Sequence, residues 1–362
     1  MRVGLVVYGS LDTLTGGYLY DRRLVEHLRK CGDELIVFSL PWRGYGSHLL
    51  DNASSQLVRE VAEASLDLLL EDELNHPSLV WLNRSLRRVV RPMVSIVHHL
   101  RSSEPWPAVP RRAFEAIETA YLRSVDAFVC TSETTWRTVE RRLRRNVPAL
   151  VASPGGDRLP STVTAELVRA RDAAGPLEIV HVGALTPRKG LDVLLRGLAP
   201  VPRGAARLTV VGDEMRAPAF AAQVHRLARR LDLEGDLRWL GPLSDSALAD
   251  VLAHSHVLAV PSFYEGFGIV YLEAMAFGLV CLGSAAGGAA EIIKDGVTGV
   301  LVPPGDPGAI TRALQAWVAD RHGLARMGVE ALEDSRTSPT WEQCMSRVRQ
   351  FLTGLPAHSS VV

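Results

Sequence analysis

The chain has 362 residues, well above the roughly 150 residues of a common domain, so we predict two domains rather than one compact core. Apolar residues make up 47% and charged residues 22% of the chain, which is ordinary globular composition and excludes disorder as the main state. Forty basic side chains balance forty acidic ones, so the strong global field expected of a nucleic-acid-binding protein is absent and no nucleic-acid partner is predicted.

The first half of the chain alternates short β-branched runs with amphipathic helical patterns, which is typical of a parallel α/β sheet. Strands are predicted at Val3–Val7, Glu34–Ser39, Val94–His98, Ala127–Thr131 and Leu150–Ala152. Helices are predicted at Tyr20–Cys31, Ala113–Arg123 and Glu133–Arg145. Residues 1–157 are therefore expected to form one Rossmann-like domain.

A turn-rich run, Ser153–Asp157, and a polar segment ending at Gly175-Pro176 predict a domain junction, with the boundary near 158–176. Six further strands are predicted at Leu177–Val182, Arg207–Val211, Leu237–Leu240, Val257–Val260, Val280–Gly283 and Gly299–Val302. Residues 158–338 thus form a second Rossmann-like domain. A last helix is expected from about Thr340 to about Leu352, within residues 339–362.

The cysteine pattern argues against a zinc site and against a disulfide framework. The four cysteines are far apart and form neither a Cys-x-x-Cys pair nor a Cys/His ligand spacing: Cys31, Cys130, Cys281 and Cys344. The apolar start of the chain is too short for a signal peptide, and no run approaches the roughly 18 apolar residues of a spanning helix. We therefore expect a cytoplasmic protein whose contact with membranes is at most peripheral.

The usual phosphate-binding fingerprints are missing. The loop Gly9–Gly17 after the first strand lacks Gly-x-Gly-x-x-Gly spacing, and no Gly-x-x-x-x-Gly-Lys-Ser/Thr occurs, which argues against a dinucleotide dehydrogenase and a P-loop enzyme. This loop ends instead in the pair Gly16-Gly17 before a helix, where backbone amides can approach an anion closely. Taken alone, the pair is explained equally well by an ordinary tight turn.

The segment Pro261–Ala276 gives a stronger signal. A strand ends near Pro261, a glycine-flanked loop follows, and a helix starts at about Ile269, so loop amides and the helix dipole point toward an anion site. Glu265 and Glu273 bracket this loop and could accept hydrogen bonds from hydroxyls on either side of a bound diphosphate. Either glutamate alone would be explained by helix capping or by a solvated helix face, whereas the two together with the glycines favour a ligand site.

Two cations follow the strand Leu177–Val182. Arg188 and Lys189 lie after the carboxyl end of a parallel strand, which is where open α/β sheets bind ligands. There they could neutralise a leaving diphosphate, which gains negative charge as its bond to the substrate breaks. The alternative is a pair of exposed basic residues in a turn, and for Arg188 that alternative is equally good.

These residues carry a family resemblance. Glu265 to Glu273 matches the Glu-x7-Glu motif of retaining glycosyltransferases with the GT-B architecture, and Val182–Pro304 resembles the donor domain of family 4, the glycosyl transferases group 1. Further matches are Val211-Gly212-Asp213, Trp239-Leu240-Gly241, Gly287-Gly288 before Glu291, Asp295-Gly296 before Gly299, Gly16-Gly17 and Pro154–Asp157. The resemblance implies an α/β fold of two Rossmann-like domains that face each other across a cleft, with a C-terminal helix that crosses back to the first domain.

The resemblance also implies roles in the second domain, which would bind the nucleotide-sugar donor. Glu273 would hold the ribose hydroxyls, and Glu265 would hold a hydroxyl of the transferred sugar. Lys189 and Arg188 would bind the diphosphate. The remaining donor-binding residues would be Gly266, Phe267, Gly268 and Ile269, through their amides, and Leu243.

The first domain would bind the acceptor and complete the site. Gly16 and Gly17 would close on the diphosphate, and His98 would line the reaction centre near the sugar. His98 together with Lys189 and Glu265 thus forms the implied catalytic set. Without the family, a histidine at a strand end is more often a satisfied structural residue.

Three positions depart from the family pattern. Ala184 stands where arginine often follows the glycine of the diphosphate loop, so the cation count rests on Arg188 and Lys189. His99 stands where aspartate often follows the family histidine, so the assignment between His98 and His99 stays open. Leu19 replaces a residue that is commonly polar, which affects the expected acceptor contacts rather than the donor site.

The expected reaction is retaining transfer of a hexose from a UDP- or GDP-sugar to an acceptor hydroxyl. Both motif glutamates have binding roles in the family, so we expect front-face substitution, in which the leaving phosphate oxygen helps to deprotonate the acceptor. No Asp-x-Asp metal motif is present, and we expect neither a metal nor a cofactor. The alternatives are a nucleotide-sugar epimerase, which would need no acceptor, and a nucleotide-sugar binding protein without activity.

The acceptor itself is not encoded in any recognisable motif. Trp42–Tyr45 and Arg101–Trp106 offer aromatic and basic groups that could stack on a sugar or hold an anionic acceptor, or could simply pack their loops. The segment Trp136–Arg145 reads as a solvated helix face or as a basic surface for an anionic membrane. Its arginines are Arg137, Arg141, Arg142, Arg144 and Arg145.

Overall fold

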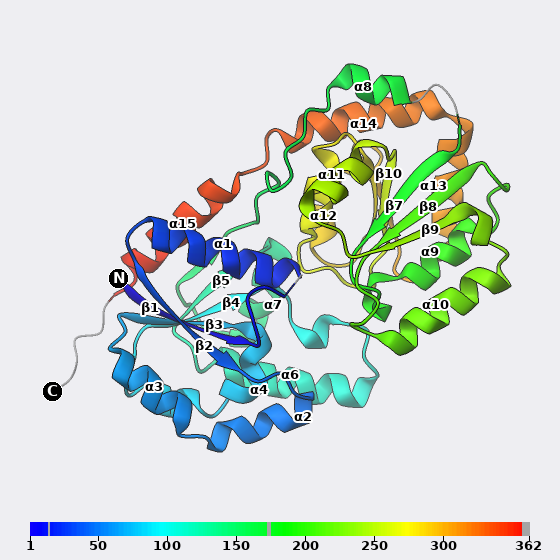
Figure 1. Ribbon diagram of the computed structural model, residues 1–362. Coiled ribbons are helices and arrows are strands. Elements are labelled where there is room, and N and C mark those ends of the chain that lie inside the picture. The colour runs from blue at the N-terminus through cyan, green and yellow to red at the C-terminus, as the bar shows by residue number, and fades with distance from the viewer. Residues whose placement is uncertain (14, 172–174, 357–362) are drawn as a thin grey trace. The chain divides into compact units, whose positions relative to one another are not determined.

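The computed structural model describes residues 1–13, 15–171 and 175–356 (Figure 1). The chain divides into two compact units, one made of Met1–Pro154 together with the C-terminal residues from Trp341, and the other of Gly155–Thr340. The boundary between the two units at Pro154 and Gly155 lies inside the turn-rich run 153–157. Residues 172–174, which belong to the polar segment expected at the junction, lie outside the described residues.

The first unit is a parallel sheet of six strands in the order β2-β1-β3-β4-β5-β6. Its strands are β1 (Arg2–Tyr8), β2 (Glu34–Leu40), β3 (Leu68–Asp72), β4 (Met93–Val97), β5 (Ala127–Cys130) and β6 (Ala149–Val151). Its longer helices are α1 (Gly16–Lys30), α3 (Gln56–Ala64), α6 (Ala108–Leu122), α7 (Glu133–Leu143) and α15 (Trp341–Gly354). Short helical turns complete it: α2 (Tyr45–His48), η1 (Leu49–Ala53), η2 (Glu73–Asn75), α4 (His76–Leu79), α5 (Asn83–Leu86) and η3 (Arg101–Ser103).

The second unit is also a parallel sheet of six strands, in the order β12-β11-β10-β7-β8-β9. Its strands are β7 (Leu177–Val182), β8 (Ala206–Val211), β9 (Leu237–Gly241), β10 (Val257–Val260), β11 (Val280–Ser284) and β12 (Gly299–Val302). Its helices are α8 (Ala165–Ala170), α9 (Leu191–Leu198), α10 (Pro218–Arg230), α11 (Asp245–Ala253), α12 (Ile269–Met275), α13 (Pro307–Ala319) and α14 (Arg321–Ser335). The shorter turns are η5 (Pro187–Lys189), η6 (Glu234–Asp236) and η7 (Gly288–Glu291).

Both sheets contain a point where the winding of the chain reverses. In the second unit, β7 and β10 are neighbours, so the chain proceeds outward from this pair in opposite directions. In the first unit the corresponding neighbours are β1 and β3. Open parallel sheets bind ligands outside the carboxyl ends of the strands at such a reversal, because the two loops diverge and leave a crevice. The topology thus locates one candidate site in each unit.

The α/β class and the two Rossmann-like units are confirmed, and every strand expected from the sequence is present. One central strand, β3, was not predicted. Its residues Leu-Leu-Leu-Glu-Asp contain no β-branched or aromatic side chain and directly follow the helical pattern of α3, so the run does not read as a strand. Helix α6 also begins earlier than expected, because Pro110 is tolerated in its first turn.

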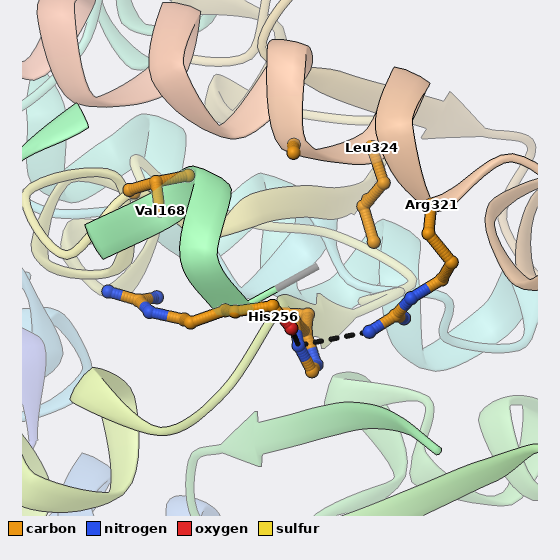
Figure 2. Close-up of a pocket in the computed structure, with 7 residues that line it drawn as sticks. Val168, His256, Arg321 and Leu324 are labelled. Atoms are coloured by element: carbon orange, nitrogen blue, oxygen red, sulfur yellow. Dashed lines mark hydrogen bonds between the residues drawn. The ribbon is translucent and has the colours of Figure 1, made fainter. Parts of the chain in front are cut away.

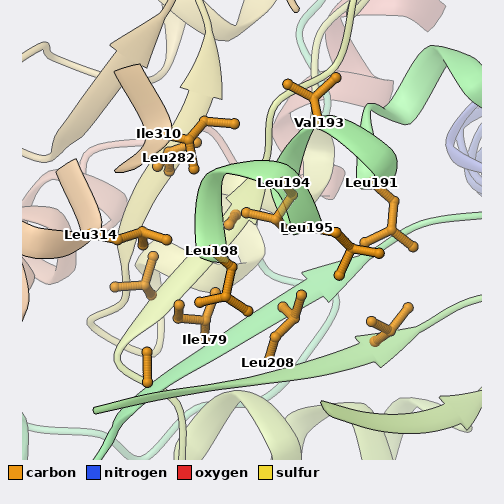
Figure 3. Packing of buried hydrophobic residues seen from close by; sticks show 14 of the residues in the cluster. Ile179, Leu191, Val193, Leu194, Leu195, Leu198, Leu208, Leu282, Ile310 and Leu314 are labelled. Carbon is orange, nitrogen blue, oxygen red and sulfur yellow. The ribbon is translucent and has the colours of Figure 1, made fainter. Parts of the chain in front are cut away.

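The core of the second unit is built where α9 and α13 pack over one face of the sheet (Figure 3). Leu194 and Leu198 of α9 are buried with Leu314 of α13. The two helices can approach closely because Gly197 has no side chain, and a Cβ there would lie only 2.6 Å from Ile310. This packing fixes α9, whose first turn follows the predicted diphosphate-binding residues.

Helix α15 packs on α1 and so belongs to the first unit, which confirms the expected return of the C-terminal helix (Figure 1). Trp341 meets the ring of Tyr20 edge-on, with centroids 6.0 Å apart, and Met345 is buried. Arg349 donates from Nε to Asp33 at 2.7 Å, where the N-terminal ammonium also binds. Burial would raise the pKa of Asp33, but these two cations outweigh it and hold the pKa below its ordinary value.

No helix among the residues placed by the structure is long and apolar enough to cross a membrane.

We predict that Met345→Ala lowers the free energy of unfolding of the first unit by about 2–5 kcal/mol, because a buried side chain is replaced by a cavity between α15 and α1. Hydrogen exchange should accelerate in α1 and in β1–β6. The exposed Gln350→Ala on the same helix is the matched control and should have little effect. Acceleration confined to β7–β12 would contradict the assignment of α15 to the first unit.

Candidate functional site

Two oppositely charged residues meet at the reversal point of the second unit. Lys189 lies in the η5 turn after β7, and Glu265 lies in the loop after β10. Because these strands are parallel neighbours, their carboxyl ends place both side chains at the same edge of the sheet. Lys189 Nζ donates to Glu265 Oε2 at 2.7 Å, and both side chains are largely buried. The structure therefore brings together two of the residues that the sequence singled out.

Arg188 and Ser262 complete the surroundings of this carboxylate. The Arg188 guanidinium lies 3.5 Å from Glu265 Oε1 and donates to the carbonyl of Tyr264 at 2.9 Å. Ser262 Oγ donates to Glu265 Oε2 at 3.1 Å. The Phe263 amide donates to the Arg188 carbonyl at 2.7 Å, which ties the two loops to each other. Arg188, predicted as an optional cation, thus faces the same carboxylate as Lys189.

The charges of this cluster set the protonation of Glu265. Burial by itself would raise the pKa of Glu265, but the nearby Lys189 and Arg188 outweigh it and hold the pKa at about 2. Burial is also the largest influence on Lys189 and lowers its pKa, while Glu265 acts in the opposite direction. Glu265 is therefore a carboxylate at neutral pH and can only accept hydrogen bonds.

The glycines around the pair are required by close backbone contacts. Gly190, directly after Lys189, has φ of +67°, and a Cβ there would lie 2.2 Å from the carbonyl oxygen of Pro261. Gly287 has φ of +87°, and its Cβ would lie 2.0 Å from the carbonyl oxygen of Glu265, which also accepts the Gly288 amide at 2.7 Å. Gly190 and Gly287 thus let the loops after β7, β10 and β11 pack against one another.

The loop between Glu265 and α12 has the predicted form. Gly268 is the N-cap of α12 with φ of +99°, and a Cβ there would lie 2.5 Å from the Tyr271 ring. The side chain of Phe267 is buried in the apolar cluster beneath the loop, and Ile269 and Leu243 pack against the same cluster. The side chains of Phe267, Ile269 and Leu243 thus pack inside the unit, so any contact of these donor-binding candidates with a ligand would come from the backbone.

Glu273 has a partner that the sequence did not reveal. Its carboxylate Oε1 accepts a hydrogen bond from Arg158 Nε at 2.5 Å, and the same guanidinium donates from NH1 to Asp245 at 2.7 Å. Glu273 is buried, whereas Asp245 at the start of α11 is exposed. Glu265 and Glu273 thus have different cationic partners, Lys189 and Arg158. No spacing in the sequence relates position 158 to position 273.

In the first unit, the predicted glycine pair and histidine are adjacent. Gly16 and Gly17 open α1 after the N-cap Thr15, and a Cβ on Gly17 would lie 3.0 Å from the ring of His98. His98 follows β4, and its Nε2 is 3.3 Å from Asp21 Oδ1. His99 contacts Glu104 at 3.0 Å instead. This geometry favours His98 for the predicted role, which stays a prediction.

Three buried carboxyl groups lie beside His98, at the reversal point of the first unit. Asp72 ends β3, Glu73 follows it, and Asp21 projects from α1. Glu73 accepts the backbone N–H of His98 at 2.9 Å. Burial raises the pKa of Asp21 and of Asp72 to about 7 and raises the pKa of Glu73 well above its ordinary value. The cluster was not predicted from the sequence because β3, which carries Asp72, was not predicted.

Asp21, Asp72 and His98 also offer ligand atoms within 4.8 Å of one another, which is a geometry that could hold a metal ion. Asp21 and Asp72 are completely buried, and the charge of Asp21 adds to the effect of burial in raising the pKa of Asp72. Two carboxylates this close repel each other when both are charged, and one bound proton relieves that repulsion, as a metal ion would. The absence of a metal requirement stays a prediction.

Tyr45, Arg101 and Trp106, from the two loops considered for the acceptor, form one packed cluster, whereas Trp42 is 47% exposed and stacks on Tyr8. The Arg101 guanidinium lies 4.8–5.1 Å from the ring centroids of Tyr45, Trp106 and Phe114. Tyr45 and Trp106 also contact the Phe114 ring at their edges. These contacts correspond to the loop-packing alternative, since the arginine is surrounded by the aromatic groups of its own unit.

The arginine-rich helix α7 does not present all of its cations to solvent. Arg142 NH1 donates to Glu118 at 2.6 Å, and its NH2 donates to Ser102 Oγ. Arg137, Arg141 and Arg144 are exposed. A surface for an anionic membrane, if it formed on this helix, would therefore depend on the exposed arginines and not on Arg142.

A small hollow lies at the other edge of the second sheet (Figure 2). His256 directly precedes β10 and accepts the Glu178 amide on Nδ1 at 2.9 Å, so this hollow is at the amino ends of the strands. The Arg321 guanidinium lines the hollow and lies 3.0 Å from His256 Nε2. The hollow is therefore separate from the edge of the sheet that carries Lys189 and Glu265.

A known protein family matches the part of the chain that carries the site of the second unit. Residues 167–334 match the family described as glycosyl transferases group 1, a range that contains Lys189, Glu265 and Glu273. The match lies within the second unit and covers most of it. This finding confirms the resemblance inferred from the Glu-x7-Glu motif, while assignment to family 4 and the retaining outcome stay predictions.

Curated relatives match over part of their length. A D-inositol 3-phosphate glycosyltransferase 2 from Catenulispora acidiphila is 35% identical over 162 residues, which cover 43% of this chain and 38% of that protein. A D-inositol 3-phosphate glycosyltransferase from Corynebacterium glutamicum is 33% identical over 217 residues, which cover 58% of this chain and 50% of that protein. The chain thus spans half or less of the length of these relatives.

Solved structures share the fold over the whole chain. A sucrose-phosphate synthase from Thermosynechococcus elongatus has a TM-score of 0.81 at 22% identity, covering 99% of this chain and 100% of its own. Anabaena HepE, solved in complex with UDP-glucose, has a TM-score of 0.78 at 20% identity, covering 98% and 100%. These similarities confirm the GT-B fold of the chain.

The buried carboxyls predict how stability depends on pH. A carboxyl whose pKa rises on folding, here from about 3.9 toward 7, stabilises the fold while protonated, and this contribution disappears as the pH rises between these values. Asp72→Asn keeps the shape of the protonated acid. The melting temperature of the wild type relative to this variant should therefore fall from pH 5 to pH 8.

The exposed Asp232→Asn after α10 serves as the control, and its difference from the wild type should not change over this range because its neighbour Arg203 keeps its charge. A difference for Asp72→Asn that is flat or rises over this range would contradict proton sharing at Asp72.

Proposed function

We propose that the chain is a retaining, metal-independent hexosyltransferase that moves a hexose from a UDP- or GDP-sugar to an acceptor hydroxyl. In this proposal the second unit binds the donor and the first unit binds the acceptor, with working boundaries at 1–157, 158–338 and 339–362. The observation that carries the proposal is the buried Lys189–Glu265 pair with Arg188 at the β7/β10 reversal. A diphosphate is the ligand that would use two cations at that position.

The diphosphate would bind Lys189, Arg188 and the amides of Gly266–Ile269. As the anomeric carbon–oxygen bond breaks, the leaving diphosphate gains negative charge, and preoriented cations stabilise that charge most effectively where water is excluded. Lys189 meets this condition because its side chain is only 14% exposed. Glu265, which is paired with Lys189, would accept a hydrogen bond from a hydroxyl of the hexose and would keep the ammonium group oriented.

The ion pairs also bear on the mechanism. Glu265 is bound to Lys189, and Glu273 is bound to Arg158, so each motif carboxylate is committed to a cation. This supports front-face substitution over a covalent glycosyl intermediate. The acceptor oxygen would form its bond to the anomeric carbon on the face from which the phosphate oxygen departs, and the acceptor proton would pass to that phosphate oxygen.

Gly16, Gly17 and His98 are proposed as the contribution of the first unit. The exposed start of α1 offers backbone amides to an anion, because the first amides of a helix have no partners within it. His98 is placed beside Gly17, and burial lowers its pKa, so the neutral imidazole is favoured near neutral pH. A neutral histidine can donate or accept a hydrogen bond at the sugar without adding charge.

The choice of ligands for testing follows from the relatives. HepE was solved with UDP-glucose, so UDP and UDP-sugars are the first donors to examine, with GDP-sugars second. The matching curated proteins are D-inositol 3-phosphate glycosyltransferases, so phosphorylated polyols are the first acceptors to examine. A nucleotide-sugar epimerase would convert the donor sugar without an acceptor, and analysis of the sugar product distinguishes the two activities.

We predict that UDP or GDP raises the melting temperature of the wild-type protein and that replacing the charged pair abolishes most of this shift. Lys189→Met alone would leave Glu265 buried with Arg188 as its only close cation, so the double variant Lys189→Met/Glu265→Gln is the better test. Its affinity for the nucleoside diphosphate should fall roughly ten- to a hundredfold.

The control is Lys294→Met, which removes an exposed lysine from the same unit. Glu273→Ala should likewise weaken donor use. Wild-type nucleotide affinity in the double variant, measured on folded protein, would refute the donor-site assignment.

A separate prediction concerns metal. If Lys189, Arg188 and the loop amides carry the charge of the diphosphate, turnover of the identified donor in excess EDTA should equal turnover with magnesium. Loss of activity in EDTA with recovery on addition of magnesium or manganese would exclude this mechanism and would direct attention to Asp21, Asp72 and His98 as ligands.

A further inference from the structure

Arg158 lies on the segment through which the chain enters the second unit, and this segment is fastened directly to α12. A Cβ on Gly156 would lie 3.2 Å from the Cβ of Leu272, so the backbone approaches that helix closely. Leu159 is buried in the apolar cluster that also contains Leu272 and Met275. Arg158 stands between these two anchored positions, which limits where its side chain can reach.

The guanidinium of Arg158 joins two carboxylates. Its Nε donates to Glu273 Oε1 at 2.5 Å, and its NH1 donates to Asp245 Oδ1 at 2.7 Å. The side chains of Arg158 and Glu273 are 16% and 4% exposed, whereas Asp245 is 60% exposed. The guanidinium of Arg158 therefore links Asp245, which is exposed at the start of α11, to Glu273, which is buried inside the unit.

The contact with Arg158 compensates for the energetic cost of burying the Glu273 carboxylate. A carboxylate removed from water without a partner is strongly destabilised, and a charge-assisted hydrogen bond from arginine compensates for that loss. Burial opposes the charge of Arg158 as well, but Glu273 outweighs this effect and raises the pKa of the guanidinium. Among the contacts given by the described residues, Arg158 is the cation that binds Glu273.

We propose that Arg158 is a positioning residue for the donor ribose, holding the Glu273 carboxylate in one orientation so that it can accept hydrogen bonds from the ribose hydroxyls. The inference rests on the proposed function, in which Glu273 contacts the ribose. Arg158 itself needs no contact with the ligand. It acts by fixing Oε1, which leaves the lone pairs of Oε2 and the remaining lone pair of Oε1 for hydroxyl donors.

Arginine is suited to this task because its planar group can bind two carboxylates at once, whereas the single ammonium of lysine cannot reproduce both bonds in the same geometry. Arg158→Lys should therefore keep a positive charge near Glu273 but lose the link to Asp245. A role in structure alone would make a different prediction: substitution would lower stability without changing how the protein distinguishes ribose from deoxyribose.

The experiment compares UDP with 2′-deoxy-UDP, and GDP with 2′-deoxy-GDP, by calorimetric titration of the full chain. The wild type should bind the ribose form of its nucleotide more tightly, by about tenfold or more, because a hydrogen bond to a charged group is lost in the deoxy form. Arg158→Gln should bind both forms with nearly equal affinity. Glu273→Gln should give the same result, and the double variant should be no worse than either single one.

Two further variants keep the test decisive if Arg158→Gln does not fold. Arg158→Lys and Asp245→Asn each preserve part of the network, and both should show a ribose preference between those of the wild type and Arg158→Gln. The matched control is Arg229→Gln, an exposed arginine near the end of α10, which should keep the wild-type preference.

The outcomes separate this inference from the proposed function. A full ribose preference in a folded Arg158 variant overturns the positioning role. A wild type that binds nucleoside diphosphates without preferring ribose overturns it too, but leaves the Lys189 site and the proposed function standing. A wild type that binds neither UDP nor GDP overturns both.

Discussion

A lysine and a glutamate withdrawn from water at one edge of a sheet depend on each other, because removal of either leaves an uncompensated charge. Lys189 and Glu265 meet this requirement only because β7 and β10, distant in the sequence, are neighbours at the reversal of the winding. The same contact explains the glycines at 190 and 287, where any side chain would collide with the backbone that carries the pair. Motif charges and motif glycines are thus parts of one packing requirement.

The first unit places polar groups at the equivalent point of its own sheet but balances them differently. Asp21, Asp72 and Glu73 gather there, and burial favours their protonated forms. One reversal point therefore carries an ion pair whose carboxylate, Glu265, has a pKa held at about 2. The other carries Asp21 and Asp72, whose pKa burial raises to about 7, next to the imidazole of His98.

The sequence was sufficient for the strands with β-branched residues and for the loop from Glu265 to Ile269, because periodicity and glycine spacing are local signals. The return of α15 to the first unit was implied instead by the family resemblance. The sequence was not sufficient for β3, whose leucines carry no strand signature, and so the carboxyl cluster at its end was missed. Arg158 was missed for another reason. Its contact with Glu273 joins residues 115 positions apart, and only the packing of the segment 156–159 on α12 creates it.

The placement of α15 makes the first unit discontinuous in the sequence, whereas the second unit is one uninterrupted segment. During synthesis, the second unit can therefore complete its sheet while the first unit still lacks the helix that covers α1. Tyr20 of α1, and Asp33, to which Arg349 binds, therefore stay uncovered until α15 has left the ribosome. The usual order in which the N-terminal domain matures first is reversed in this topology.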